Sequence, residues 1–246
     1  MTGDLDPPRR SRTGNSVPPH AVAAMFDEIA PVYDRMNTLM TFGLDAGWRR
    51  AAVKASGVGP GDAAIDVACG TGKLAEALAE QVGPFGRVLA VDLAPGMIAE
   101  AKARHRDLVQ LEFRVGDALA LPAPDASFDA ATIAFGLRNL ADFAHGFREL
   151  ARVVRPGGRV VCLELSRPRP RVWGRIFQGT FHRSAPVLGS LFRRRSAYRY
   201  LPASLEGFPT PEELARTMLE AGLTDVVHRS FGLGSVALHS GRVAEA

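Results

Sequence analysis

The sequence predicts an α/β fold with a mostly parallel sheet of seven strands and a C-terminal antiparallel hairpin. Between residues 63 and 165, short apolar runs alternate with amphipathic helical segments, which is typical of parallel β-α-β units. After residue 222, two strand-like runs are separated by only "GLG", a link short enough for an antiparallel pair. A chain of 246 residues is long enough to bury one large core of this kind.

The N-terminal part precedes this alternation. Residues 1–20 are rich in Pro, Arg and small polar residues, so we expect a flexible tail that buries too little apolar surface to order itself. Residues 21–56 are predicted to be helical with a break at Pro31, and they form a lid over the sheet. We expect residues 21–243 to form a single domain.

The alternating part predicts five strands and three helices. The strands are expected at residues 63–68, 87–93, 109–116, 128–137 and 159–165, and the helices at 73–82, 95–105 and 143–154. A helix at 210–222 follows, with Thr210 as its N-cap and Gly222 past its end, and then strands at 224–231 and 234–241. An open parallel sheet that ends in a hairpin is the pattern of class I S-adenosylmethionine-dependent methyltransferases. A plain dinucleotide-binding fold does not need the hairpin.

The positive charge of the chain is concentrated in one segment. The net charge is +4, yet residues 165–205 contain nine Arg and no Asp or Glu, so the remainder is net acidic. We expect residues 166–205 to form a basic helical insert, with aromatic side chains between its arginines. Three roles stay open for it: a cap over the substrate, which also fits a dimer contact, a contact with an anionic membrane surface, or nucleic-acid binding.

The two cysteines and the N-terminus bear on location. Cys69 and Cys162 lie in apolar surroundings, which favours a reducing compartment without disulfides. The first 20 residues lack the apolar core of a secretory signal, and no run approaches the ~18 apolar residues of a membrane helix. We therefore expect a cytoplasmic protein that is able to touch a membrane from its inner face.

A glycine loop follows the first predicted strand in "IDVACGTGKLA" (65–75). Gly70 and Gly72 allow a tight turn, and the helix that starts after Thr71 offers free N–H groups to a ligand. Asp92 ends the next strand about twenty residues on, where it can accept hydrogen bonds from two ribose hydroxyls. Alone, this pattern suits a nicotinamide dinucleotide as well as S-adenosylmethionine.

Three features favour S-adenosylmethionine over the dinucleotide. Asp66 lies within the strand before the loop, where a carboxylate can hold the ammonium of methionine directly or through water. The third strand closes with "GDA" (116–118), so that Asp117 can accept from the adenine amino group while the Ala118 amide faces the ring. The terminal hairpin is the third feature. We expect no metal site, since no His/Cys cluster with ligand spacing is present.

Several longer motifs go beyond this common framework. They are "FDEIAPVYDRMN" (26–37), "VDLAPGM" (91–97), "FGLRN" (135–139) and "RVVRPGG" (152–158) with "LELS" (163–166) after it. With these motifs the chain resembles the UbiE/MenG family of quinone-biosynthesis C-methyltransferases over residues 21–243. Members methylate demethylmenaquinol and, in some cases, a ubiquinol precursor. The chain departs from the family at two positions: Ala134 stands where members often have Ser, and Asp45 stands where they commonly have His.

The resemblance implies site residues and a reaction. It assigns Thr71, Asp92, Asp117 and Ala118 to the cofactor, and it implies a prenylated demethylmenaquinol as substrate. A reduced ring is the nucleophile, so Arg138 and Asn139 are expected to hold a ring oxygen and stabilise the phenolate.

The proton acceptor and the roles of neighbouring residues stay open. Tyr33 or a water is expected to accept the proton, because an arginine side chain stays protonated and cannot accept one. Glu164 faces either the substrate or an arginine partner. Two other readings are a nucleic-acid methyltransferase, for which no base-methylation motif is present, and a non-catalytic nucleotide-binding protein. We expect no nucleic-acid partner.

Overall fold

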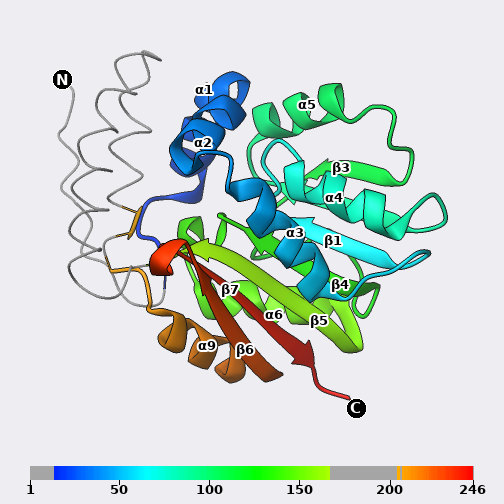
Figure 1. The fold of residues 1–246 in the computed structure, drawn as a ribbon, viewed down its shortest axis with the longest axis vertical. Coiled ribbons are helices and arrows are strands. Elements are labelled where there is room, and N and C mark those ends of the chain that lie inside the picture. Colours follow the sequence, from blue (N-terminus) through cyan, green and yellow to red (C-terminus); the bar gives the residue numbers. More distant parts are fainter. Residues whose placement is uncertain (1–13, 167–203, 206, 246) are drawn as a thin grey trace.

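One sheet of seven strands runs through the centre of the computed structural model, which describes residues 14–166, 204–205 and 207–245 (Figure 1). The strand order is β3-β2-β1-β4-β5-β7-β6, with β5–β7 and β7–β6 antiparallel and the other pairs parallel. The strands are β1 (Ala63–Val67), β2 (Arg87–Asp92), β3 (Leu111–Val115), β4 (Phe128–Ala134), β5 (Val154–Leu165), β6 (Leu223–Phe231) and β7 (Val236–Val243). This is the predicted class I methyltransferase fold.

Helices cover both faces of the sheet and its carboxyl edge. They are α1 (Pro19–Ile29), α2 (Tyr33–Thr41), α3 (Asp45–Ser56), α4 (Lys73–Val82), α5 (Pro95–Arg104), α6 (Phe143–Val153) and α9 (Pro211–Glu220), with short 3-10 turns η1 (Ala30–Val32), η2 (Leu137–Asn139) and η3 (Gly232–Gly234). α3, α4 and α5 pack on one face of the sheet, and α6 and α9 pack on the other (Figure 1).

Two apolar cores result from the alternation of side chains along the buried strands. In β1, Ile65 and Val67 face a core shared with α6 and α9, while Ala64 faces a core shared with α3 and α4. Every residue of β1 is buried, as expected for a central parallel strand. Asp66 lies on the same strand, so a carboxylate is placed inside the sheet.

The predicted elements agree with the observed ones to within a few residues, and three strands differ at their ends. The predicted strand 128–137 was wrong at its end, because β4 stops at Ala134 and the chain then turns into η2. Phe135 causes the break, since its φ of 58° is left-handed and incompatible with a strand. The fifth strand starts at Val154 rather than at 159, and β7 runs from 236 to 243 rather than 234–241.

Capping explains two helix starts. Thr210 is the N-cap of α9, as predicted from the sequence, and the structure adds a capping box with Glu213. Asp142 accepts from the backbone N–H of His145 and caps α6.

α1 and α2 lie over the carboxyl ends of the parallel strands, beside α5 (Figure 1). α1 starts at Pro19, and Asn15 is buried with its N–H donating to the Leu140 carbonyl at 2.7 Å. The last residues of the predicted tail thus contact the domain. Residues 1–13 of that tail, and nearly all of the predicted basic insert 166–205, lie outside the described residues.

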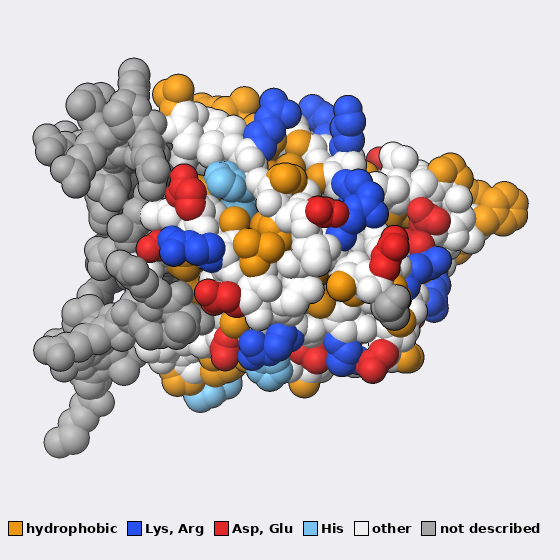
Figure 2. Space-filling model, turned by 90° about the horizontal axis from the view of Figure 1, so that it is seen from below, with side chains coloured by type: hydrophobic (Ala, Val, Ile, Leu, Met, Phe, Trp, Pro, Cys, Tyr) orange, Lys and Arg blue, Asp and Glu red, His pale blue; other side chains and the backbone are white. Residues whose placement is uncertain are grey.

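The described surface carries both signs of charge. On the face shown in Figure 2, Lys and Arg side chains lie among Asp and Glu side chains without forming a basic stripe. In the described part of the chain, no helix has the length and apolar character that a bilayer crossing requires.

Candidate active site

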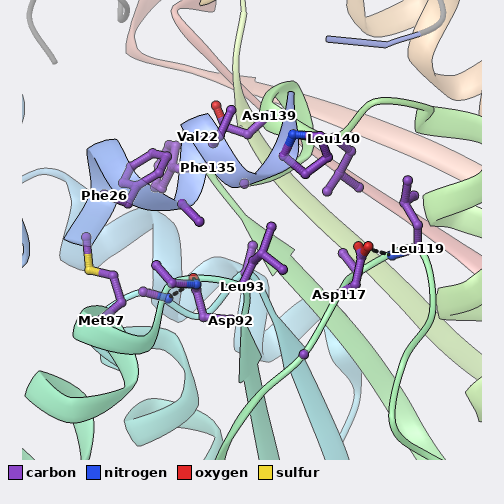
Figure 3. A pocket seen from close by; sticks show the side chains of 18 of the residues that line it. Val22, Phe26, Asp92, Leu93, Met97, Asp117, Leu119, Phe135, Asn139 and Leu140 are labelled. Carbon is purple, nitrogen blue, oxygen red and sulfur yellow. Dashed lines mark hydrogen bonds between the residues drawn. The ribbon is translucent and has the colours of Figure 1, made fainter. Parts of the chain in front are cut away.

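A cavity of about 760 Å³, open in part to solvent, lies where the parallel strands end. Its floor comes from the loops after β1, β2, β3 and β4, and α1 forms the opposite wall. In Figure 3, Val22 and Phe26 of α1 lie across the cavity from Asp92 and Asp117. We call this space the first cavity. A crevice at the carboxyl ends of the strands is where ligands bind in open α/β sheets.

The glycine loop is held by Asp92. The Gly70 N–H donates to Asp92 Oδ2 at 2.8 Å, and the Ala94 N–H donates to Asp92 Oδ1 at 2.9 Å. Gly70 has a φ of 56°, which glycine adopts without strain. Burial raises the pKa of Asp92, while these backbone N–H groups oppose the shift. Gly70 and Asp92 both line the first cavity, as predicted, and each Asp92 oxygen retains lone pairs for ligand hydroxyls.

Asp117 and Ala118 also lie where the sequence predicts them. Both line the first cavity on the loop after β3, next to Leu119. The Leu119 N–H donates to Asp117 Oδ1 at 2.9 Å, which fixes the carboxylate at the cavity wall (Figure 3). Leu93 and Met97 add apolar surface nearby, so this end of the cavity suits a flat aromatic group with a polar edge.

Two predicted cofactor residues face away from the cavity. The Thr71 hydroxyl donates to Asp34 Oδ1 of α2 at 2.7 Å, and the side chain is buried. Gly72 turns toward Phe113, whose ring atoms lie 2.8 and 2.9 Å from the position of a Cβ added there. Any larger residue at position 72 collides with this ring. Gly72 thus allows the loop to pack against Phe113, on the side that does not line the first cavity. Thr71 ties the loop to α2.

Asp66 is buried below the glycine loop, with 1% of its surface exposed. Thr132 Oγ1 donates to Asp66 Oδ1 at 2.6 Å, and Asp66 Oδ2 is buried without a hydrogen-bond partner among the described residues. Burial raises the pKa of Asp66 to about 7, against the lowering effects of Thr132 and the positive charge of Arg49. The backbone N–H of Ala75 also lowers this pKa, and Asp66 does not itself line the first cavity. A buried carboxylate next to a ligand site is suited to a cationic group.

Arg138 lines a different cavity from the one that Asp92 and Asp117 line. This second cavity, of about 620 Å³ and open in part to solvent, is lined by α2, α3, η2 and the ends of β5 and β7. Arg138 Nη1 donates to Glu164 Oε1 at 2.6 Å, and the Arg138 N–H donates to Glu164 Oε2 at 3.1 Å. Glu164 is therefore the partner of an arginine, one of its two predicted roles. The pair holds the guanidinium at the wall of a mostly apolar space.

Tyr33 and Phe135 line both cavities, so the two spaces meet at these side chains. Tyr33 is the first residue of α2, and its ring lies edge-on to Phe26 of α1 with centroids 6.0 Å apart. Asn139 lines the first cavity from η2. The three residues predicted for catalysis thus lie around one junction: Tyr33 at the junction, Asn139 on one side and Arg138 on the other.

The sequence did not reveal much of the second cavity. Trp48, Arg49, Ser235 and Val236 line it, and none was predicted to do so. Asp45 was noted only as a departure from the resembled family, and it also lines this cavity. Asp45 and Arg49 are spaced as neighbours on a helix, which was the available signal. Their meeting with β7, almost 190 residues along the chain, left no local pattern.

Comparison with known proteins settles the family. The model of the ubiE/COQ5 methyltransferase family matches residues 15–243, which is nearly the whole chain. The chain belongs to the ubiE/COQ5 methyltransferase family. It is thus a methyltransferase, and the predicted resemblance is confirmed.

Two curated relatives illustrate the similarity within the ubiE/COQ5 family. The chain is 46% identical over 220 residues to "Demethylmenaquinone methyltransferase" of Thermus thermophilus, covering 88% of this chain and 99% of the relative. It is 41% identical over 220 residues to "Ubiquinone/menaquinone biosynthesis C-methyltransferase UbiE" of Geobacter sulfurreducens, covering 88% of this chain and 86% of the relative.

Solved structures agree on the fold. A SAM-dependent methyltransferase from Thermotoga maritima aligns with a TM-score of 0.63 at 19% identity, covering 89% of this chain and 98% of that one. The [4+2]-cyclase SpnF aligns with a TM-score of 0.71 at 17% identity, covering 96% and 100%. Since the fold also serves a cyclase, the substrate of this ubiE/COQ5 family member has to be argued from its site.

Proposed function

We propose that the chain transfers a methyl group from S-adenosylmethionine to a ring carbon of demethylmenaquinol, forming menaquinol in menaquinone biosynthesis. The observation that carries this proposal is the meeting of two cavities at Tyr33 and Phe135. One cavity is lined by carboxylates suited to the cofactor, and the other by a buried guanidinium suited to a phenolate oxygen. The printed name of the Thermus thermophilus relative supports the choice of substrate.

The residues of the first cavity fit S-adenosylmethionine. Asp92 is placed for the ribose hydroxyls, and Asp117 and Ala118 for the adenine. Asp66 does not line the first cavity, but it lies on β1 just before the glycine loop, and we assign it to the ammonium, directly or through a water. When bound, this cofactor supplies an electrophilic methyl group on a sulfonium. The described fold thus offers a polar contact for each polar end of the molecule, and an apolar wall from α1 between them.

The chemistry asks three things of the protein. It must align the ring carbon with the methyl group, exclude water and favour the ionised ring oxygen. As the new carbon–carbon bond forms, the carbon–sulfur bond breaks, and the ring carbon then loses its proton to restore the aromatic diol. We assign stabilisation of the ring oxygen to Arg138 and Asn139, and proton transfer to Tyr33 or a water beside it. The lid helices α1 and α2 exclude solvent from the junction.

A ubiquinol precursor is the second candidate substrate. The printed name of the Geobacter sulfurreducens relative covers both quinones. A benzene diol is smaller than a naphthalene diol, and both present an oxygen next to the accepting carbon. Direct competition between the two acceptors at limiting enzyme decides which is preferred.

Two further parts of the proposal concern the surroundings of the enzyme. We propose a cytoplasmic protein whose basic segment, residues 166–205, caps the substrate and contacts the inner face of the membrane, where a prenylated quinol resides. This segment lies almost entirely outside the described residues. We also propose that it contributes to a homodimer. Vesicle sedimentation with anionic and neutral lipids tests the membrane contact, and light scattering tests the homodimer.

The test of the function uses labelled S-adenosylmethionine with a short-chain demethylmenaquinone, in parallel tubes with reduced and with oxidised substrate. Methylated product in the reduced tube alone is the expected result, because only the diol is an electron-rich nucleophile. Equal product in both tubes contradicts the phenolate mechanism. No product in either tube, with cofactor binding confirmed by calorimetry, contradicts the proposed substrate and directs the search to benzoquinols and other lipids.

A further inference from the structure

The second cavity holds a second buried guanidinium besides that of Arg138. Arg49 comes from α3, and its side chain is 12% exposed, against 5% for Arg138. Both arginines line the same cavity. Long cationic side chains are seldom buried this far without a partner or a role.

Both guanidiniums bear on one residue, Phe135. Arg138 Nη1 donates to the Phe135 carbonyl, while Arg49 Cζ lies 5.6 Å from the centroid of the Phe135 ring. The backbone of Phe135 is left-handed, with a φ of 58°, a conformation that is costly for a bulky side chain and concentrates at functional sites. Both cations thus lie next to one aromatic residue at the junction, Arg138 at its backbone carbonyl and Arg49 near its ring.

Each guanidinium has its own carboxylate. Glu164 pairs with Arg138 at 2.6 Å, and Asp45 pairs with Arg49. Thr41 Oγ1 adds a hydrogen bond to Asp45 Oδ1 at 3.0 Å. Burial acts to raise the pKa of Asp45, but Arg49 and Thr41 lower it below its usual value. Lys73 Nζ also lies 4.0 Å from Asp45 Oδ2. With the two ionised pairs balanced and one further cation beside them, the cavity suits a neutral or singly ionised ligand.

The walls between these pairs are aromatic. Trp48 and Phe135 both line the second cavity, with ring centroids 6.4 Å apart and their planes tilted by 56°. The second cavity thus combines flat apolar surfaces with two N–H donor groups, a combination that suits a planar ring carrying more than one oxygen.

We propose that Arg49, held in place by Asp45, binds the second oxygen of a para-dihydroxy aromatic ring whose first oxygen faces Arg138. Arg49 is then a specificity-determining residue that selects para-diols over monohydroxy arenes, and Asp45 is a positioning residue that acts through it. This inference rests on the proposed function and deepens it, since it states which feature of the acceptor is recognised away from the reacting carbon.

The experiment measures kcat/KM for two acceptors. One is reduced short-chain demethylmenaquinone, and the other is its monohydroxy analogue, which keeps only the hydroxyl next to the accepting carbon. The two differ in intrinsic reactivity, but this difference is the same for every variant and cancels when preferences are compared. Loss of a charge-assisted hydrogen bond typically costs a factor of about 10 to 100. We expect Arg49→Met to reduce the preference for the diol by such a factor, through KM of the diol, with the rate on the analogue little changed.

Three variants complete the test. Arg50→Met changes the exposed neighbour on α3 and is expected to keep the preference of the unmodified protein. Arg49→Lys keeps the charge and is expected to restore part of the preference. Asp45→Asn is expected to lower the preference as well, because Arg49 loses its anchor. If Arg49→Met does not fold, as judged by its melting temperature and cofactor affinity, the comparison of Arg49→Lys with Asp45→Asn decides instead.

The outcomes separate this inference from the function on which it rests. An unmodified protein that methylates the diol, with an Arg49→Met variant of unchanged preference, overturns the role of Arg49 alone. Equal losses on both acceptors in Arg49→Met show a structural role and also overturn the proposal. If the unmodified protein binds S-adenosylmethionine but methylates neither acceptor, the proposed function fails, and the inference fails with it.

Discussion

Asp66 illustrates how one buried side chain couples cofactor binding to pH. In the free protein, burial raises its pKa to about 7, so much of the carboxyl is protonated at pH 6. An ammonium group requires the ionised form, and binding must therefore release a proton. We predict that the affinity for S-adenosylmethionine falls about tenfold per pH unit below 7 and levels off above it, while the α-amino group stays charged up to about pH 7.7.

Calorimetry in buffers of different ionisation enthalpy measures the proton release directly. Asp66→Asn keeps the shape of the side chain and is expected to bind more weakly, with neither the pH dependence nor the proton release. A proton count near zero at pH 6 for the unmodified protein contradicts the assignment of Asp66 to the ammonium.

The two cavities predict opposite effects for two other substitutions. Asp92 holds the glycine loop and lines the first cavity, so Asp92→Ala is expected to abolish measurable cofactor binding. Arg138 lines only the second cavity, so Arg138→Ala is expected to leave cofactor affinity within about twofold and to lower kcat by two to three orders of magnitude, as for loss of one charge-stabilising donor. Equal cofactor affinity in Asp92→Ala and the unmodified protein contradicts the site, and a silent Arg138→Ala favours a non-catalytic binding protein.

The lid helices are tied to the core by carboxylates that act on other elements. α5 has Ala94 at its N-cap and receives no side-chain cap from it, but Asp27 of α1 accepts from the Gly96 N–H at 2.6 Å. Asp34 of α2 accepts from Thr71 and pairs with Arg104 at the end of α5. The Asp27 bond replaces the missing cap of α5, and the Asp34 pair adds a second link from α2 to an arginine that also pairs with Glu100, so the position of α1 and α2 and the stability of α5 are linked.

We predict that Asp27→Ala lowers the free energy of unfolding by about 1 kcal/mol, the usual cost of a lost helix cap, and speeds cofactor dissociation. Glu80→Ala on the exposed face of α4 is the matched control, expected to change neither quantity. Denaturant titration gives the stability, and stopped-flow displacement gives the dissociation rate. A variant that loses stability but dissociates at the original rate shows that α1 does not gate the first cavity.

Most elements could be predicted because local patterns determine them. α4 lies at the predicted residues 73–82, and Thr210 caps α9 as predicted. The end of β4 was predicted three residues too late, because the apolar run continues through "AFGL" while the left-handed backbone of Phe135 breaks the strand. That break turns Arg138 into η2 and toward the second cavity, which an alternating pattern cannot reveal.

At the scale of the whole molecule, the site depends on which strand ends and which distant segments of the chain the fold brings together. The carboxyl ends of parallel strands lie at one edge of the sheet, so the grouping of Asp66, Asp92 and Asp117 could be predicted from strand order. The second cavity joins α2 and α3 to β7, from opposite ends of the chain. The residues that line it come together by packing between segments far apart in the sequence, so no local periodicity predicts them.

The position of the first cavity predicts how a bound cofactor changes the melting temperature and the hydrogen exchange of the protein. The first cavity lies between α1 and the strand ends, so S-adenosylmethionine bound there bridges lid and core. At a hundredfold excess over Kd, a ligand stabilises its protein by about 2.7 kcal/mol, which raises Tm by roughly 5–11 °C for a domain of this size. Hydrogen exchange should slow in α1 and in the loops after β1–β3, and stay unchanged in β6 at the far edge. A rise in Tm with protection in β6 but none in α1 contradicts the position of the first cavity as the cofactor site.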